Sequence, residues 1–262
     1  ILCLLALSAC AENKAHMPIV IQEAPQEIAE ALEINNFGFV QSKSVLLTNV
    51  VEANAVEYNN SLVYLFDFGM NGNLSIGTSN DDRQSVGDDY RFAYIMKYQN
   101  YYLNFYNIGG SVMLSKSYDL KSWKLINNGN PVLSQTAGTI YNAIWNVGVT
   151  VDDSGVFHLL AETSSAGNDT AGLAYSTATI YDDLIDFDTN RSTDHVISLA
   201  GNPWLEFVPG RGLVIVYGKL TVDGLWYVSA ATMKNGVFTE SPNMTIASHG
   251  IHVCDPHVLS IN

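Results

Sequence analysis

Basic residues are scarce in this chain of 262 residues, which contains 12 Lys and Arg against 26 Asp and Glu and has a formal net charge of −14. Surfaces that bind nucleic acid or anionic lipid need clustered cations. Nucleic acid is therefore not an expected partner, and neither is direct binding to a charged membrane surface. Neutral sugars or cations suit this charge better.

Cysteine is also scarce, with three residues. The apolar residues 1–9 lead into Leu7-Ser8-Ala9-Cys10, which closely resembles the lipobox of bacterial lipoproteins, although an initiating Met and a basic segment do not precede it. We expect the mature chain to begin at a lipid-modified Cys10. The protein would then be lipid-anchored in the bacterial cell envelope, periplasmic or surface-exposed, with the anchor as its only membrane contact. The alternative for residues 1–10 is a buried strand or helix end, which the polar residues 11–16 disfavour.

If Cys10 is modified, Cys254 is left without a partner, so we expect no intramolecular disulfide. Long apolar runs and helical periodicity are missing as well. No later segment approaches the roughly 18 apolar residues of a spanning helix. No segment keeps a 3.6-residue apolar period, which argues against a parallel α/β fold. The sequence also lacks a glycine-rich phosphate loop, a Gly-x-Ser-x-Gly elbow and a Ser/His/Asp signature.

A repeated strand pattern is what the chain does contain. Four units align at Tyr64, Tyr102, His158 and Val214, with spacings typical of the blades of a β-propeller. A fifth unit begins at Asp255. The sequence therefore predicts an all-β, five-bladed β-propeller whose fifth blade is truncated in this chain after its inner strand. We assign residues 1–10 to a signal and lipobox remnant, 11–34 to a tether and 35–262 to the propeller domain, incomplete at its C-terminus.

Alternation and turn residues predict the strands of each blade. The expected inner, second and third strands are residues 53–58, 62–68 and 74–79, then 91–98, 101–107 and 111–117, then 145–151, 156–162 and 172–177, and finally 202–208, 212–218 and 226–232. Residues 237–240 are the outermost strand of the fourth blade. An outer strand within residues 37–51 is expected to close the ring with the last blade.

One segment resembles a known superfamily. Residues 115–125, Ser-Lys-Ser-Tyr-Asp-Leu-Lys-Ser-Trp-Lys-Leu, followed by Gly-Asn-Pro-Val-Leu at 129–133, resemble the S-x-D-L-x-x-W blade end of the five-bladed propeller glycosidases. That superfamily includes the arabinanases and xylosidases of glycoside hydrolase family 43, invertases, levansucrases and mannoside phosphorylases. Asp255-Pro256 resembles the Asp-Pro that opens an inner strand in those enzymes, and Asn202-Pro203 is a weaker copy.

The resemblance implies three carboxylates that converge on an axial pocket near the starts of the inner strands. An acid and a second carboxylate stand about 5 Å apart in retaining enzymes and about 6.5 to 9.5 Å apart in inverting ones. We predict Asp255 and Glu52 as the reacting pair and Asp89 as the third carboxylate. Glu162 is an alternative acid, because the end of a second strand returns to the same rim. Asp67 and Asp88 lie at comparable positions.

Blades three and four open with Asn146 and Asn202, which can bind hydroxyl groups but cannot transfer protons at neutral pH. We therefore assign them to substrate binding. The other predicted substrate contacts are Asn54, Trp145, Trp204 and His257, with Trp226, Tyr90 and Tyr141 as further candidates for stacking on sugar faces. A buried, hydrogen-bonded histidine is the alternative for His257.

Metal signals are weak. His252, Cys254 and His257 lack the further ligand that a zinc site needs. Asp186-Phe187-Asp188-Thr189-Asn190, with Asp194 nearby, has Arg191 and Ile197 where an EF-hand requires Gly and Glu. The segment is at most an irregular calcium loop, so we expect no cofactor beyond a structural calcium.

The function that these observations favour is glycoside hydrolysis of a plant or algal polysaccharide or oligosaccharide by carboxylate acid/base chemistry. The alternative is a non-catalytic, glycan-binding propeller lipoprotein, which the asparagines of blades three and four favour. In both cases the expected partner is a carbohydrate, and we expect a monomer.

Overall fold

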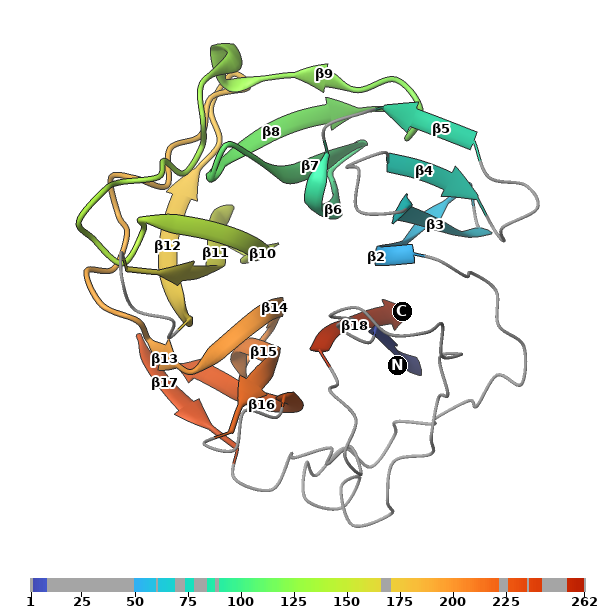
Figure 1. Ribbon diagram of the computed structural model, residues 1–262. Coiled ribbons are helices and arrows are strands. Elements are labelled where there is room, and N and C mark those ends of the chain that lie inside the picture. The colour runs from blue at the N-terminus through green and yellow to red at the C-terminus, as the bar shows by residue number, and fades with distance from the viewer. Residues whose placement is uncertain are drawn as a thin grey trace.

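The computed structural model describes residues 2–8, 50–59, 61–68, 74–77, 84–87, 90–165, 171–221, 226–234, 236–241 and 254–261. These residues form four four-stranded antiparallel sheets and one two-stranded sheet. The sheets stand around a common axis, as the view in Figure 1 shows. A single 3-10 turn, η1 (Asn127–Gly129), is the only helical element among the described residues. The predicted all-β propeller is confirmed.

Within each four-stranded sheet the strands follow the order of the chain. The first blade contains β2 (Val50–Tyr58), β3 (Ser61–Phe68), β4 (Leu74–Gly77) and β5 (Gln84–Gly87), and the second contains β6 (Arg91–Tyr98), β7 (Tyr101–Ile108), β8 (Ser111–Ser117) and β9 (Lys124–Leu125). The third contains β10 (Ala143–Val151), β11 (Val156–Ser164), β12 (Gly172–Thr179) and β13 (Ile197–Ser198), and the fourth contains β14 (Ala200–Val208), β15 (Gly212–Leu220), β16 (Trp226–Lys234) and β17 (Val237–Glu240).

All twelve predicted inner, second and third strands are present with small shifts at their ends. The predicted outermost strand of the fourth blade, residues 237–240, is present as well. The four residues that aligned the repeats all lie in second strands. Sequence reasoning missed the outer strands of the first three blades, namely β5, β9 and β13. Two of these have two residues and one has four. Segments this short carry no alternation from which a strand could be recognised.

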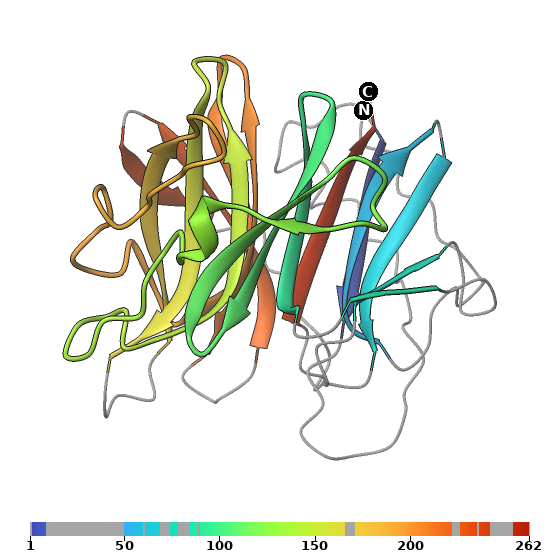
Figure 2. The ribbon, with the colours of Figure 1, turned by 90° about the horizontal axis from the view of Figure 1, so that it is seen from above.

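The fifth sheet pairs two distant segments of the chain. Strand β1 (Leu2–Ser8) runs antiparallel to β18 (Cys254–Ile261). Strand β18 contacts both β14 and β2, so it lies between the fourth and the first blade (Figures 1 and 2). Residues 37–49, in which a closing strand is predicted, lie outside the described part of the chain.

The start of every inner strand is irregular. The pairing register shifts between Val50 and Glu52 in β2, between Arg91 and Tyr94 in β6, between Ile144 and Val147 in β10, and between Gly201 and Trp204 in β14. Such bulges leave residues out of the ladder and re-aim their side chains. Asn146 and Asn202 both lie in these bulges.

Tyr94 joins three blades near the axis. Its side chain is buried, and the backbones of Val149 in β10 and Leu205 in β14 lie close enough to its hydroxyl to affect its pKa. Burial raises the pKa of this phenol far above its ordinary value. The hydroxyl therefore stays protonated.

The segment that carried the family resemblance is a turn on the outer side of the second blade. Asp119 Oδ1 accepts hydrogen bonds from Ser117 Oγ at 3.0 Å and from the backbone amides of Lys121 and Ser122 at 2.9 and 2.7 Å. Trp123 Nε1 donates to the carbonyl of Leu120 at 3.2 Å. Donation from the backbone amides lowers the pKa of Asp119 to about 2. The motif therefore stabilises a blade end.

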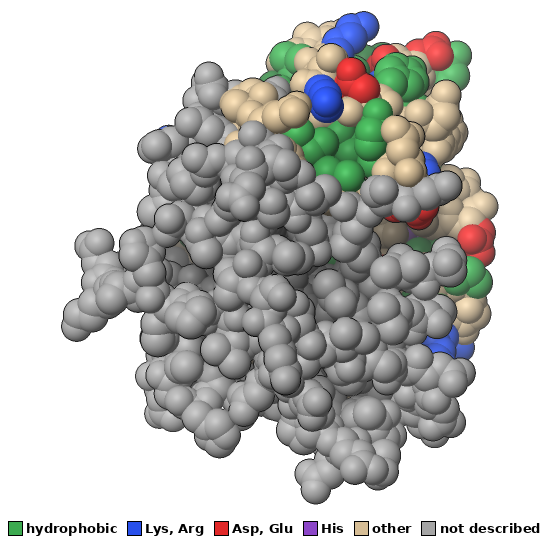
Figure 3. Space-filling view, turned by 90° about the vertical axis from the view of Figure 1, so that its right-hand side faces the viewer, with side chains coloured by type: hydrophobic (Ala, Val, Ile, Leu, Met, Phe, Trp, Pro, Cys, Tyr) green, Lys and Arg blue, Asp and Glu red, His purple; other side chains and the backbone are tan. Residues whose placement is uncertain are grey.

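On the face presented in Figure 3, the described side chains carry both signs of charge. Figure 3 shows Lys, Arg, Asp and Glu side chains interspersed with apolar and uncharged polar ones on the face that it presents. In the described ranges we also find no helix that combines the length and apolar character needed to cross a membrane.

Candidate axial site

Three polar side chains from blades three and four meet at the rim where the inner strands begin. Glu162 lies near the end of β11, Asn146 in the bulge of β10 and Asn202 in the bulge of β14. Glu162 Oε2 accepts hydrogen bonds from the backbone amide of Asn202 at 3.0 Å and from Asn146 Nδ2 at 3.3 Å. Asn146 Nδ2 also donates to Asn202 Oδ1. The three residues form one hydrogen-bonded group.

Glycines allow this approach. A Cβ atom on Gly201 would stand 2.7 Å from Cδ of Glu162, so only glycine leaves room for the carboxyl group. A Cβ on Gly148 would stand 2.5 Å from the carbonyl oxygen of Pro203, so glycine at 148 lets β10 approach β14. Asn202 has a φ of 50°, a left-handed conformation that asparagine tolerates better than most residues.

The hydrogen-bond directions constrain where Glu162 can carry a proton. Both groups that contact Oε2 are N–H donors, so Oε2 acts as an acceptor. Protonation of Glu162 on Oε1 would leave both of these hydrogen bonds in place. Both asparagines are neutral, so Glu162 is the only ionisable member of the group. The group can therefore orient one carboxyl and bind hydroxyls, while a second reacting carboxylate has to come from another blade.

The other predicted carboxylates lie near the starts of their inner strands. Asp255 is the second residue of β18, at a register shift, because Cys254 pairs with Ser8 and Pro256 pairs with Leu7. Glu52 is the third residue of β2 and stands directly opposite Asp67 in β3. Asp255 therefore lies in a register shift at the start of its strand, as Asn146 and Asn202 do, whereas Glu52 is paired and Val51 is the residue left out of the ladder in β2. The roles of Asp255 and Glu52 stay predictions. Asp88 and Asp89 lie outside the described residues, so the assignment of Asp89 stays a prediction.

The predicted substrate-binding residues have different surroundings. Asn146 and Asn202 are brought together, and Trp145 beside them is partly exposed. Trp204 is 9% exposed and belongs to the largest apolar core cluster, a position suited to packing. Asn54 lies opposite Leu65 in the β2–β3 pair, and His257 opposite Ala6 in the β1–β18 pair.

His195 is a rim residue that sequence reasoning missed. Its Nε2 lies 2.9 Å from Thr163 Oγ1, next to Glu162 in the chain, and its ring covers Gly172, where a Cβ would come within 2.5 Å of the ring. Burial lowers the pKa of His195, so the ring is neutral near pH 7. No motif surrounds this residue in the sequence, and only the fold brings it to the rim.

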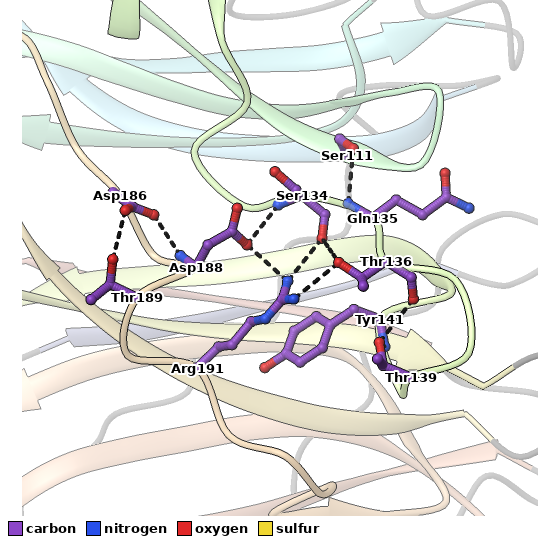
Figure 4. Close-up of polar contacts among 10 residues, drawn as sticks. All are labelled: Ser111, Ser134, Gln135, Thr136, Thr139, Tyr141, Asp186, Asp188, Thr189 and Arg191. Atoms are coloured by element: carbon purple, nitrogen blue, oxygen red, sulfur yellow. Dashed lines mark hydrogen bonds and ion pairs between the residues drawn. The ribbon is translucent and has the colours of Figure 1, made fainter.

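The acidic segment after β12, residues 186–190, forms an ion pair with Arg191 of the same chain. Asp188 Oδ1 lies 2.8 Å from Arg191 Nη1 and accepts the backbone amide of Ser134 at 3.0 Å (Figure 4). Asp186 accepts hydrogen bonds from Asp188 N and Thr189 Oγ1. The described residues hold no cluster of three His, Cys, Asp or Glu that could bind a metal ion. Calcium binding in this segment stays a prediction, and it would have to displace these contacts.

Five sheets around one axis, with bulged inner strands that carry polar residues at one rim, define the chain as a five-bladed β-propeller. Its fold is that of the five-bladed propeller glycoside hydrolases, so the resemblance seen in the sequence is confirmed for the fold. No family model matches the sequence, and no curated protein does.

Solved structures give the match. The chain is similar to an endo-arabinase from Bacteroides thetaiotaomicron, with a TM-score of 0.55 and 11% identity over 82% of this chain and 94% of that one. An endo-1,4-beta-xylanase from the same organism gives 0.53 and 15% identity over 73% and 72%. An alpha-L-arabinofuranosidase from Podospora anserina, solved with cellotriose, gives 0.55 and 11% identity over 78% and 71%.

Proposed function

We propose that the protein is a glycoside hydrolase that acts on a plant or algal polysaccharide or on its oligosaccharides. The observation that carries the proposal is the carboxyl of Glu162, held by Asn146 and Asn202 at the rim where the inner strands begin. The names of the similar structures, a xylanase, an endo-arabinase and an arabinofuranosidase, support this class of substrate.

The reaction needs two carboxyl groups on opposite sides of the glycosidic bond. In our assignment Glu162 gives the proton on Oε1 to the leaving oxygen as the bond to the anomeric carbon breaks. Asp255 acts from the opposite side, either by taking a proton from the attacking water or by bonding to the anomeric carbon itself. In the second case water later releases the sugar and Glu162 regains its proton. Glu162, the alternative acid in the sequence analysis, thus takes the place of Glu52 in the reacting pair, and Glu52 joins Asp89 as a candidate for the third carboxylate.

A substrate panel with matched variants tests the proposal. The full-length protein is assayed on chromogenic arabinosides, xylosides, galactosides and on fructans. Glu162→Gln and Asp255→Asn should each lower turnover by about a hundredfold or more, with unchanged thermal melting. Glu57→Gln, at an exposed glutamate in β2, is the control and should keep full activity. Retained turnover in Glu162→Gln would remove Glu162 from the mechanism.

One observation favours a second function. The inner strands of blades three and four present Asn146 and Asn202 where an enzyme could present carboxylates. A non-catalytic glycan-binding propeller needs only such amides and aromatic rings. In that case no member of the panel is hydrolysed, while calorimetry detects sugar binding that changes modestly in Asp255→Asn.

A further inference from the structure

Two glycines of blade four stand directly opposite each other beside the axial group. Gly201 in β14 pairs with Gly218 in β15. The carboxyl of Glu162 occupies the space that a side chain on Gly201 would fill, with Cδ 2.7 Å from the ideal Cβ. The indole of Trp226 lies against Gly218 in the same way, with Cε3 3.1 Å from the ideal Cβ of that glycine. A carboxyl and an indole thus lie beside two directly paired glycines.

Strand geometry bounds the distance between these two groups. Directly opposed residues of an antiparallel pair have Cβ positions about 4.5 to 5.5 Å apart, so the indole edge and the carboxyl carbon are separated by at most about 11 Å. The ideal Cβ of Gly218 also lies only 3.4 Å from the carbonyl oxygen of Gly201. Trp226 is therefore a close neighbour of the group formed by Glu162, Asn146 and Asn202.

Trp226 differs from the core and turn tryptophans in its surroundings. It is the first residue of β16 and is partly exposed, as Trp145 and Trp123 are, but Trp123 is hydrogen-bonded in the blade-two turn and Trp204 is packed in the core. Trp226 is the tryptophan whose ring lies against Gly218, opposite Gly201. A partly exposed indole at a rim offers an apolar face that complements the C–H face of a sugar ring.

The two asparagines supply the polar half of such a site. Asn146 Nδ2 is engaged by Glu162 and Asn202, which leaves Asn146 Oδ1 as an acceptor with no further partner among the described residues. Asn202 Nδ2 likewise remains as a donor there. One acceptor and one donor suit a pair of neighbouring hydroxyl groups. A carboxylate on the sugar would instead face Asn146 Oδ1, an acceptor with which it cannot form a hydrogen bond.

We propose that Trp226, Asn146 and Asn202 form a sugar-binding subsite that takes one neutral sugar residue beside Glu162. The ring lies on the indole of Trp226, and its adjacent hydroxyls bind the two amides. The position of the subsite rests on the axial site of the proposed function, but binding there does not depend on hydrolysis.

Binding of defined oligosaccharides to the full-length protein tests the proposal. Neutral xylo- and arabino-oligosaccharides are titrated by calorimetry, beside an oligogalacturonide of equal length. We expect the neutral sugars to bind and the acidic one to bind at least about tenfold more weakly. Trp226→Ala should weaken neutral binding by about tenfold or more, and Trp226→Phe should weaken it less, because a smaller aromatic face remains.

Two further variants separate contact from folding. Gly218→Ala adds a methyl group 3.1 Å from the indole and should weaken binding without removing the ring. Trp123→Phe is the matched control and should leave affinity unchanged. The subsite is overturned if none of the neutral sugars binds, if the oligogalacturonide binds equally well, or if both Trp226→Phe and Gly218→Ala melt like the parent and bind like it.

Hydrolysis is scored separately from binding. Sugar binding that depends on Trp226, with no turnover of any substrate, would sink the proposed hydrolase and support the subsite. Turnover that requires Glu162 while KM stays unchanged in Trp226→Phe and Gly218→Ala would support the hydrolase and overturn the subsite.

Discussion

At the residue scale, the orientation of Glu162 depends on the absence of a side chain at Gly201. Gly201 has no Cβ where the carboxyl of Glu162 lies, and its φ is not in the left-handed region, so alanine fits the backbone but not the space. Contacts this close must relax by movement of the carboxyl, of β14 or of both.

Gly201→Ala should therefore lower kcat by about tenfold or more, while all charged groups stay in place. The atoms that the added methyl group would meet are the carboxyl end of the flexible Glu162 side chain, which can move aside at little cost, so the melting temperature should change little. Kinetics on the best substrate of the panel and a thermal melt measure both effects. An unchanged kcat would mean that the contact between Gly201 and Glu162 has no role in orientation.

A second residue-scale prediction concerns charge. Asn146→Asp would place a carboxylate 3.3 Å from Glu162 Oε2, where an amide now donates. Two carboxylates in contact cannot both ionise easily, so the pKa of one rises. The upper limb of the pH–rate profile, which reports the protonated acid, should then move to higher pH.

Stability gives an independent check on the same variant. A carboxyl with a raised pKa in the folded state destabilises the protein as pH rises above the pKa of the unfolded chain. The Asn146→Asp protein should therefore lose stability relative to the parent between pH 4 and pH 7, in the range near and above the ordinary carboxyl pKa of about 4. If the melting temperatures of the parent and Asn146→Asp differ by the same amount at pH 4 and at pH 7, the introduced carboxylate does not contact Glu162.

Sequence reasoning reached Glu162, Asn146 and Asn202 because alternation and antiparallel pairing place them at one rim. It could not show that Gly201 makes room for Glu162, or that His195 hydrogen-bonds with Thr163, because these contacts join segments far apart in the chain. The choice of Trp226 among several tryptophans likewise depends on the pairing of Gly201 with Gly218.

At the scale of elements, the motif that carried the family resemblance proves to be a turn. Asp119 collects hydrogen bonds from both ends of the short connection between β8 and β9. Asp119→Ala should lower the free energy of unfolding at pH 7 by about 1 to 2 kcal/mol, because several donors lose their acceptor. Urea unfolding measures this loss.

The pH dependence of the same effect has a defined sign. The folded-state pKa of Asp119 is lowered from 3.8 to about 2, so its contribution is complete above about pH 4 and is lost as the pH falls through 2. The difference between parent and Asp119→Ala should shrink over that interval. Activity on the best substrate should not change, because the turn lies on the outer side of blade two, and a large loss of kcat would contradict this structural role.

At the scale of the whole molecule, residues 1–10 have two interpretations that exclude each other: a lipobox remnant that is removed before Cys10, and a structural strand of the fifth blade. Strand β1 pairs with β18, which contacts β14 and β2. Processing before Cys10 would remove β1 from the mature protein, so β18 would need another partner. Residues 37–49, where we predict a closing strand, could supply it. The spacing of the repeats predicted the five blades, but the pairing of β1 with β18 links the two most distant segments and has no local signal in the sequence.

Two measurements decide between these interpretations. In the first, the full precursor is expressed in a bacterial host, where we expect a mature, lipid-modified N-terminus at Cys10 by mass spectrometry and partition with membranes. Cys10→Ala should release the protein to the soluble fraction, because an anchored chain without its acyl groups has no other membrane contact.

In the second measurement, the melting temperature of a chain that begins at residue 11 is compared with that of residues 1–262. Equal melting temperatures are expected if processing removes β1 without loss. A large drop in the shorter chain, together with unchanged membrane association of Cys10→Ala, would make Leu2–Ser8 a structural strand of the fifth blade and remove the lipobox assignment.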